Sequence, residues 1–277
     1  MSDQAVRDKQ GFFDKHHFLL RRLHSLTGIV PIGVFLVAHL VTNSSLAWGK
    51  FALRGKGEGL GIAEGGVKYF HEEVTWINEQ VPHLLLIEIT LWVSIAFHSL
   101  LGVYYATTGR GNTARYPHMD NWRYTLQRWS GYLGIAFIFY HVATLRWQWT
   151  WLVPGGAEWS HHYSASTLAA ALQGSTEGFT AMGVVVSVFY FLGVSMLVFH
   201  FANGLWTAAI TWGITISVPA QRRWGAACFL LGVGLMGAAW SALGAALVLD
   251  QDQARAVEER HHAPEPAEPE SDPGFGG

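Results

Sequence analysis

Residues 25–47 read SLTGIVPIGVFLVAHLVTNSSLA and give the clearest indication of how the chain folds. It contains no Asp, Glu, Lys or Arg, and it is long enough for a bilayer crossing, which needs about 20 apolar residues. A helix suits this role because it satisfies its own backbone hydrogen bonds, which lipid cannot do. Four later segments share this character, so the sequence predicts an all-α membrane protein with a bundle of five transmembrane helices. The five predicted spans are residues 25–47, 83–107, 129–152, 180–212 and 224–249.

The composition of the whole chain agrees with this class. Of its 277 residues, 50% are hydrophobic and 14% are charged, whereas soluble domains carry about 25% charged residues. The formal net charge of −2 and the lack of a basic domain argue against nucleic-acid binding. The single cysteine, Cys228, excludes an intrachain disulfide, a cysteine-ligated iron–sulfur cluster and a Cys₄ zinc site.

The chain divides into three parts. Residues 1–24 form a polar N-terminal tail without the apolar core of a signal peptide. Residues 25–249 form the five-helix domain, with an extended outer loop at 48–82 in which we expect a short surface helix around Tyr69–Ile77. Residues 250–277 are rich in Glu, Pro and Ala, and we expect them to be disordered or bound to a partner.

The distribution of charge gives an orientation. Eleven of the 18 Lys and Arg residues lie on the side of the N-terminus, and 16 of the 20 acidic residues lie on the other side. The positive-inside rule therefore places the N-terminus in the cytoplasm and the C-terminus outside. We expect a multi-pass protein of the cell inner (plasma) membrane.

Four of the five predicted spans carry one histidine well inside the apolar run. These are His39 in FLVAHLVTN (35–43), His98 in SIAFHSLLG (94–102), His141 in FIFYHVATL (137–145) and His200 in LVFHFANGLW (197–206). An ionisable residue inside a membrane is costly and is a functional hypothesis by default. A single such histidine can be structural, but one on each of four helices favours a shared function.

The depth of these histidines groups them in pairs. His39 and His141 lie nine and ten residues before a tryptophan at the outer end of their spans, and His98 and His200 lie deeper. The two levels differ by roughly 9–17 Å at the about 1.5 Å rise per residue of a helix. Two imidazole pairs at two depths fit two stacked haems, because haem iron accepts axial histidine. A histidine proton relay is the alternative that needs no haem.

Small residues near the histidines leave room for a flat macrocycle between the helices. Gly102 and Gly204 each follow a membrane histidine by four residues, and Gly28 and Gly131 precede one by 11 and ten residues. Ordinary helix packing through small residues is the alternative for any one of these glycines.

The sequence around these residues is similar to that of a known protein family. It resembles the dihaem cytochrome b membrane anchors, of the single five-helix type, that belong to the succinate:quinone oxidoreductases (the succinate dehydrogenases and fumarate reductases). The order of the motifs and the single histidine on each of the first four spans carry the resemblance. The similar stretches are RRLHSLTGIVPIGVFLVAHLVTN (21–43), FHSLLGVYYATTG (97–109), YPHMDNWRYTLQRWSG (116–131), FYHVAT (139–144) and HFANGLWTAAITWGIT (200–215).

The resemblance implies the cofactors and partners. His98 and His200 would ligate the iron of a haem b nearer the cytoplasm, and His39 and His141 that of a haem b nearer the outer face. The chain would pass electrons between a membrane quinone, with menaquinone favoured over ubiquinone, and an iron–sulfur subunit and a flavoprotein on the cytoplasmic side. It would thus be a subunit of an enzyme without a dicarboxylate site of its own.

Further site residues follow from the chemistry of these groups. Haem propionates need charge-assisted hydrogen bonds, and a quinone that exchanges protons needs a protonatable group beside it. Glu88, inside LLLIEITLW (84–92), and Glu72 and Glu73 in the preceding loop are the candidates for proton transfer on the outer side. The candidate propionate contacts are Arg21, Arg22, His24, Ser25, Tyr124 and Arg128.

Other functions stay open at this point. The cytochrome b subunit of a nitrate reductase or formate dehydrogenase also combines few helices with two haems, although its histidines are distributed differently. A histidine-lined proton pathway or transporter needs no haem, and it favours broken helices or further polar residues at the midplane. An anchor without haem leaves the four membrane histidines unexplained.

Overall fold

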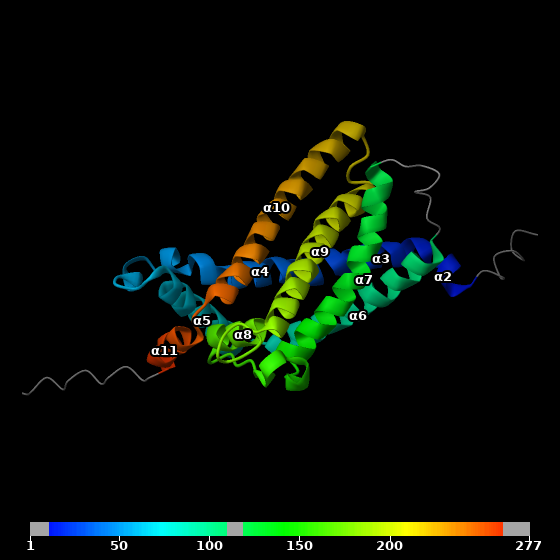
Figure 1. Cartoon of the computed structure of the whole chain (residues 1–277). Coiled ribbons are helices and arrows are strands. Elements are labelled where there is room, and N and C mark those ends of the chain that lie inside the picture. The colour runs from blue at the N-terminus through cyan, green and yellow to red at the C-terminus, as the bar shows by residue number, and fades with distance from the viewer. Residues whose placement is uncertain (1–10, 110–118, 263–277) are drawn as a thin grey trace, which may run out of the picture.

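The structure is a computed structural model that describes residues 11–109 and 119–262. Every regular element in these two ranges is a helix (Figure 1). The α-helices are α2 (Phe12–Lys15), α3 (His17–Ile29), α4 (Pro31–Ala52), α5 (Ile62–Gln80), α6 (Leu84–Thr108), α7 (Met119–Leu145), α8 (Ser164–Gln173), α9 (Ala181–Thr211), α10 (Val218–Val248) and α11 (Gln251–His262). The 3-10 helices are η1 (Arg54–Gly57), η2 (Thr150–Leu152) and η3 (Pro154–Gly156).

Four stretches are long and apolar enough to cross a membrane. They are His17–Ala52 (α3 with α4), Leu84–Thr108 (α6), Ala181–Thr211 (α9) and Val218–Val248 (α10). Helix α7 has 27 residues, but its first turns carry Arg123, Gln127 and Arg128, so its apolar part is shorter. The all-helical class and four of the expected spans are therefore present, and the fifth span stays a prediction.

Several helix ends differ from the expected spans, among them the end of α4 at Ala52 and the start of α7 at Met119. The first long helix begins at His17 and not at residue 25, and it is interrupted only where Pro31 starts α4. Helix α10 begins at Val218, because Ser217 caps it by accepting a hydrogen bond from the Ala220 amide at 3.3 Å. Helix α7 ends at Leu145 and not at residue 152, since Gln148 turns the chain with a φ of 56°.

In Figure 1 the continuous run of α3 and α4 crosses α9 and α10, and three shorter helices collect at one end. Helix α4 packs on α5 and α10, α9 packs on α7 and α10, and α3 packs on α6. Helices α5, α8 and α11 form what we call the cap, which covers the end where α4 and α10 finish and α9 starts.

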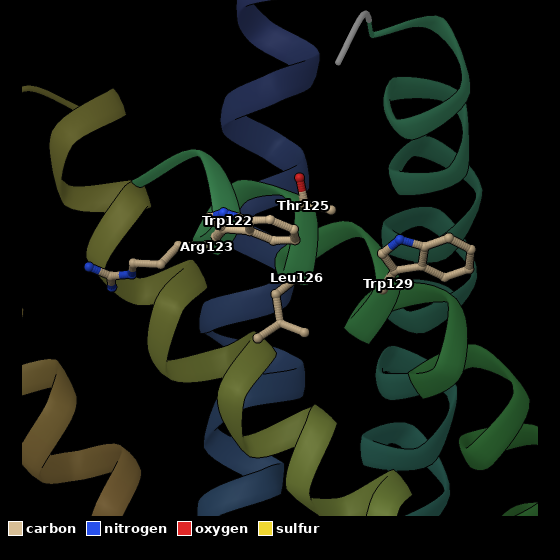
Figure 2. Close-up of a pocket in the computed structure, with 5 residues that line it drawn as sticks. All are labelled: Trp122, Arg123, Thr125, Leu126 and Trp129. Carbon is tan, nitrogen blue, oxygen red and sulfur yellow. The ribbon is translucent and has the colours of Figure 1, made fainter. Parts of the chain in front are cut away.

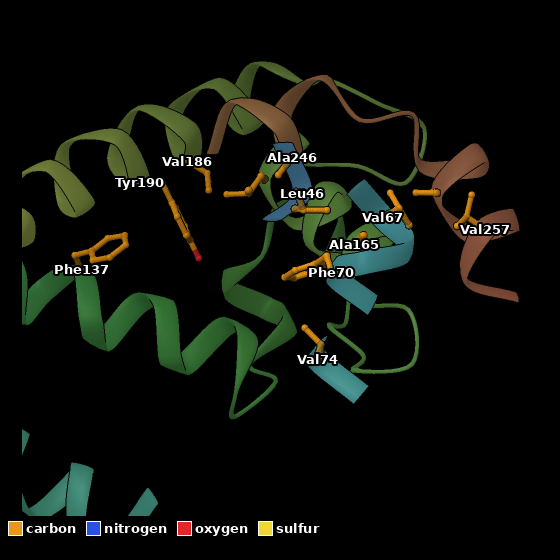
Figure 3. Packing of buried hydrophobic residues seen from close by; sticks show 12 residues of the cluster. Leu46, Val67, Phe70, Val74, Phe137, Ala165, Val186, Tyr190, Ala246 and Val257 are labelled. Atoms are coloured by element: carbon orange, nitrogen blue, oxygen red, sulfur yellow. The ribbon is translucent and has the colours of Figure 1, made fainter. Parts of the chain in front are cut away.

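A hydrophobic core joins the cap to the bundle (Figure 3). Phe70 and Val74 of α5 pack against Ala165 of α8, and Val257 of α11 closes the same cluster. The cluster continues into the bundle through Tyr190 of α9. The expected short surface helix in the 48–82 loop is thus a 19-residue helix, α5, with one buried face.

The expectation of disorder after residue 250 is wrong for residues 251–262, which form α11. Ala254 and Val257 of this helix are each only 1% exposed. Their burial stabilises the helix, which the highly charged composition of the segment does not predict. Residues 263–277 of the predicted tail, and residues 1–10 of the N-terminal tail, lie outside the described residues.

Glu258 fixes α11 to the start of α8. Its side chain is fully buried, and its carboxylate accepts hydrogen bonds from the Ala165 amide at 2.7 Å and from the Ser166 hydroxyl at 2.6 Å. A carboxylate at a helix N-terminus is favoured by the orphan amides and the helix dipole there. Burial nevertheless raises the pKa of Glu258 above its usual value, because it disfavours the charged form.

Candidate functional site

The four membrane histidines meet as two pairs between the long helices. His98 of α6 and His200 of α9 have ring centroids 6.1 Å apart and ring planes at 82°. His39 of α4 and His141 of α7 have centroids 5.7 Å apart and planes at 81°. The structure therefore brings together the same two pairs that the depth of the residues predicts.

The spacing within each pair fits two imidazoles on opposite sides of one metal ion. An imidazole nitrogen binds a metal at about 2 Å, so the centroids of two rings facing each other across an ion lie roughly 6 Å apart. The observed separations of 6.1 and 5.7 Å are close to this value. The side chains present therefore fit a bis-histidine centre at each level.

Hydrogen bonds orient the rings of the His98–His200 pair. The Nδ1 atom of His98 lies 2.8 Å from the main-chain oxygen of His24. The Nδ1 atom of His200 lies 3.1 Å from the main-chain oxygen of Gln127 and 3.1 Å from the Ser130 hydroxyl. A carbonyl oxygen accepts only, so we assign the proton of each ring to Nδ1, which leaves the Nε2 lone pair available to a metal.

Within the ranges that the structure describes, the rings of the His39–His141 pair contact polar side chains rather than main-chain oxygens. The Nδ1 atom of His141 lies 3.3 Å from the hydroxyl of Tyr190, which is buried in α9. The amide nitrogen of Asn43 lies 3.4 Å from Nδ1 of His39 and donates a shorter bond, of 2.8 Å, to the His39 main-chain oxygen. Tyr190 and Asn43 are thus the polar neighbours of this pair.

The predicted glycines lie against the deeper level. A Cβ atom on Gly28 would lie 2.5 Å from Cε1 of His98, and one on Gly131 would lie 3.2 Å from Cε1 of His200. A Cβ atom on Gly102 would lie 3.1 Å from Nε2 of His24, whereas Gly204 faces the Gln127 amide at 3.5 Å. Gly28 and Gly131 therefore give two of the histidine rings their space.

His24 adds a third imidazole at this level. Its ring stacks on His98 with centroids 4.0 Å apart and planes at 12°. Its Nε2 atom is buried and has no hydrogen-bond partner in the described part of the chain. A buried polar atom without a partner is costly, so this nitrogen fits a polar group of a bound cofactor. A propionate is such a group if the ring proton is on Nε2.

Other predicted propionate contacts have partners within the protein. Arg128 donates hydrogen bonds to the main-chain oxygens of Ala106 and Gly109 and so ties α7 to the end of α6. The guanidinium groups of Arg21, Arg22 and Arg128 lie over the rings of Tyr105, Phe18 and Tyr124 at 5.2, 4.2 and 5.2 Å. The Ser25 hydroxyl accepts a 2.8 Å bond from the Trp212 indole.

Sequence reasoning missed a polar chain behind His200. The Gln127 amide donates to the His200 main-chain oxygen at 3.1 Å and accepts from Asn203 at 2.8 Å. Arg123 donates to the Asn203 oxygen at 3.1 Å and lies over the Trp206 ring at 4.1 Å. The detectable signal was polar residues at helical spacing in otherwise apolar stretches, at 123 and 127 and at 200 and 203.

A shallow groove of about 340 Å³ lies along α7, beside these hydrogen-bonded polar residues (Figure 2). Trp122, Thr125, Leu126 and Trp129 line it together with Arg123. Trp122 and Trp129 are 63% and 66% exposed. Arg123 is already hydrogen-bonded to Asn203. Among the described residues that line the groove, none carries a carboxyl or imidazole group that could exchange protons with a quinone.

Glu88 has a partner that the sequence did not identify. Its two carboxylate oxygens accept hydrogen bonds from Nε and a terminal nitrogen of Arg146 at 3.1 and 3.0 Å. This two-point ion pair joins α6 to the end of α7, beside the stacked rings of Trp92 and Trp147. Glu72 and Glu73 lie instead on α5. Glu72 is exposed, and one buried oxygen of Glu73 has no hydrogen-bond partner among the described residues.

Comparison with known proteins gives one informative match. The chain is 33% identical over 211 residues to the succinate dehydrogenase cytochrome b558 subunit of Bacillus subtilis (strain 168), an alignment that covers 74% of this chain and 85% of that protein. No family model matches the chain, and no solved structure matches it.

Proposed function

The chain belongs to the family of succinate dehydrogenase cytochrome b558 subunits, and from this premise we propose that it passes electrons through two bis-histidine b haems. It is a membrane cytochrome b that takes part in an oxidoreductase complex with flavoprotein and iron–sulfur subunits. Our proposal adds the number of haems, their ligands, the fifth transmembrane helix and the sidedness of the chain.

The observation that carries the proposal is the presence of two histidine pairs, each at the spacing of a bis-histidine centre. Haem, when bound there, supplies one-electron transfer. His98 and His200 would hold the inner haem, and His39 and His141 would hold the outer one. Because their Nδ1 atoms face carbonyl oxygens, His98 and His200 would use Nε2 to hold a haem iron.

The residues around the inner level would hold the edge of its haem. The buried Nε2 of His24 lies at the level of His98 and would donate a hydrogen bond to a propionate. Gly28 and Gly131 have no side chains, so they leave space beside the rings of His98 and His200. Arg21, Arg22, Ser25, Tyr124 and Arg128 also belong to this end of the bundle, and Arg21 is exposed and can turn toward an anionic group.

The end of the bundle opposite the cap would face the cytoplasm and the iron–sulfur subunit. The described basic residues at this end agree with the positive-inside rule. They are Lys15, Arg21, Arg22, Arg123, Arg128, Arg222 and Arg223. Exposed apolar side chains on this surface, with Phe18 64% exposed and Leu19 55% exposed, suit a protein partner. The cap would then face the outside.

Glu88 would transfer protons for a quinone at the outer end of the bundle. Arg146 holds its carboxylate in one position through two hydrogen bonds, and the neighbouring Trp92 and Trp147 give the aromatic surface that a quinone ring stacks on. Glu72 and Glu73 would serve as relays toward the outer solvent. Menaquinone is the proposed quinone, in preference to ubiquinone.

A dithionite-reduced minus oxidised spectrum of the purified complex, with haem quantified per chain, tests the proposal. Two b haems that titrate at separate potentials are the expected result. One haem per chain would refute the assignment of one pair. No haem in folded protein produced in cells with ample haem would favour a histidine proton pathway. Succinate-driven quinone reduction distinguishes this subunit from the cytochrome b of another membrane oxidoreductase.

A further inference from the structure

Three metal-ligand side chains meet in the cap, away from the four membrane histidines. Glu79 lies in the last turn of α5, and His161 and His162 lie in the turn before α8. One ligand atom from each, a carboxylate oxygen or an imidazole nitrogen, lies within 4.8 Å of the other two. The two imidazole rings have centroids 3.8 Å apart. The proposed electron transfer uses none of these residues.

The backbone that carries these side chains is held in place. Helices α5 and α8 pack together in the buried core of the cap, through Phe70, Val74 and Ala165. The turn is tied to α8 by a 3.1 Å hydrogen bond from the Ser160 amide to the Thr167 hydroxyl. Gln148 holds the residue before the turn by donating to the Trp159 oxygen at 3.1 Å.

The ligand set is specific in its chemistry. Two imidazoles and one carboxylate suit zinc and neighbouring transition metals, whereas calcium and magnesium prefer sites made of oxygen alone. Bonds to zinc measure about 2.0–2.2 Å, so the three ligand atoms must approach one another slightly. Glu79 and His162 are exposed and can make this adjustment by rotating their side chains.

We propose that Glu79, His161 and His162 form a binding site for a divalent transition-metal ion of the zinc class, with water completing the coordination. The ion would join the end of α5 to the start of α8 and so tie together two helices of the cap. A ligand that binds only the folded state stabilises it. Zinc is therefore expected to raise the temperature at which the cap unfolds.

Zinc titration of the intact, haem-containing complex, without a polyhistidine tag and after washing with chelator, tests the site. Calorimetry should show one site that Glu79→Gln, His161→Ala and His162→Ala each weaken by at least about tenfold, since loss of a residue that only supports a metal ligand already costs about 10–100-fold. His83→Asn is the matched control, since His83 is an exposed histidine at the start of α6 outside the cluster, and it should bind zinc as the wild type does. The haem spectrum verifies that each variant has assembled.

Copper(II) gives a second readout that does not depend on activity. Its electron paramagnetic resonance spectrum should show coupling to two imidazole nitrogens in the wild type and to one in His162→Ala. The proposal is overturned if a variant that combines Glu79→Gln, His161→Ala and His162→Ala binds zinc as tightly as the wild type. It is also overturned if the nitrogen coupling of bound copper is the same in the wild type and in the histidine variants. A zinc-induced rise in Tm that persists in all three variants would also contradict it.

Discussion

The Nδ1 atom of His98 lies 2.8 Å from the main-chain oxygen of His24, across the contact between α6 and α3. This bond assigns the ring proton to Nδ1 and leaves Nε2 as the metal-binding atom. The same arrangement recurs between His200 and the Gln127 oxygen at 3.1 Å. Two of the four proposed ligands are thus oriented by main-chain oxygens, which a side-chain substitution does not remove.

Substitution of the histidines should separate the two haems. His98→Ala or His200→Ala should remove the inner haem, and His39→Ala or His141→Ala the outer one, because each variant would lack one of the two imidazoles proposed to hold the iron. Haem per chain and the redox titration of the reduced spectrum provide the measurement. Retention of both haems at unchanged potentials in any of the four variants would refute that ligand.

Gly28→Ala should disturb the inner level alone. The new Cβ atom would lie 2.5 Å from Cε1 of His98, so the ring must move away from its bond to the His24 oxygen. We expect loss of the inner haem or a shift of its potential, with the outer haem unchanged. Gly237→Ala on α10 is the control, since its Cβ atom would meet nothing within 4 Å. An inner haem identical to the wild type would mean that Gly28 does not confine His98.

Glu88→Gln should slow quinone turnover and leave the haems in place. A glutamine keeps a hydrogen bond to Arg146 but cannot exchange a proton, and general acid–base groups contribute about 10²–10⁴-fold to rate. The expected loss is at least about tenfold in succinate–quinone activity, measured over a range of pH. Glu177→Gln, at an exposed position before α9, should behave as the wild type. Unchanged turnover at every pH would dismiss the role of Glu88.

The attachment of α11 should depend on pH through Glu258. Its folded-state pKa is raised by burial, so the folded state binds more protons than the unfolded state in the window between the two pKa values. The attachment is therefore strongest below the unfolded pKa of about 4.3 and weakens as pH rises through the folded pKa. Hydrogen exchange of the α11 amides, corrected for intrinsic rates, should show faster opening at higher pH.

Two variants of Glu258 make this test specific. Glu258→Gln keeps an oxygen to accept from the Ala165 amide and should abolish the pH dependence. Glu258→Ala leaves that buried amide unsatisfied and should weaken the attachment by about 1–3 kcal/mol. An exchange rate in Glu258→Gln that varies with pH as in the wild type would show that another group controls α11.

The local pattern of apolar residues was enough to predict the long helices and to identify the four membrane histidines. Helix α9 covers Ala181–Thr211 against an expected span of 180–212, because a long apolar run can satisfy its backbone in lipid only as a helix. Depth along a helix follows from the residue count, since the rise per residue is constant at about 1.5 Å. The pairing of His39 with His141 and of His98 with His200 followed from that count alone.

The sequence failed where a helix owes its stability to distant contacts. The highly charged segment 251–262 gave a pattern typical of disorder, yet α11 buries Ala254, Val257 and Glu258 against segments far away in the chain. Helix α7 ends at Leu145, seven residues before the expected end of its span at 152, because the turn at Gln148 is fixed by its contact with Trp159.

A helical membrane protein with four histidines at two depths can be inferred from the amino-acid sequence, because hydrophobic length and helical rise are properties of each segment alone. The contacts between Glu88 and Arg146, between the two inner imidazoles and the oxygens of His24 and Gln127, and among Glu79, His161 and His162 emerge from the folded chain. These pairings depend on how helices are rotated against one another. That rotation is set by packing among residues separated by many turns of chain, which no local pattern records.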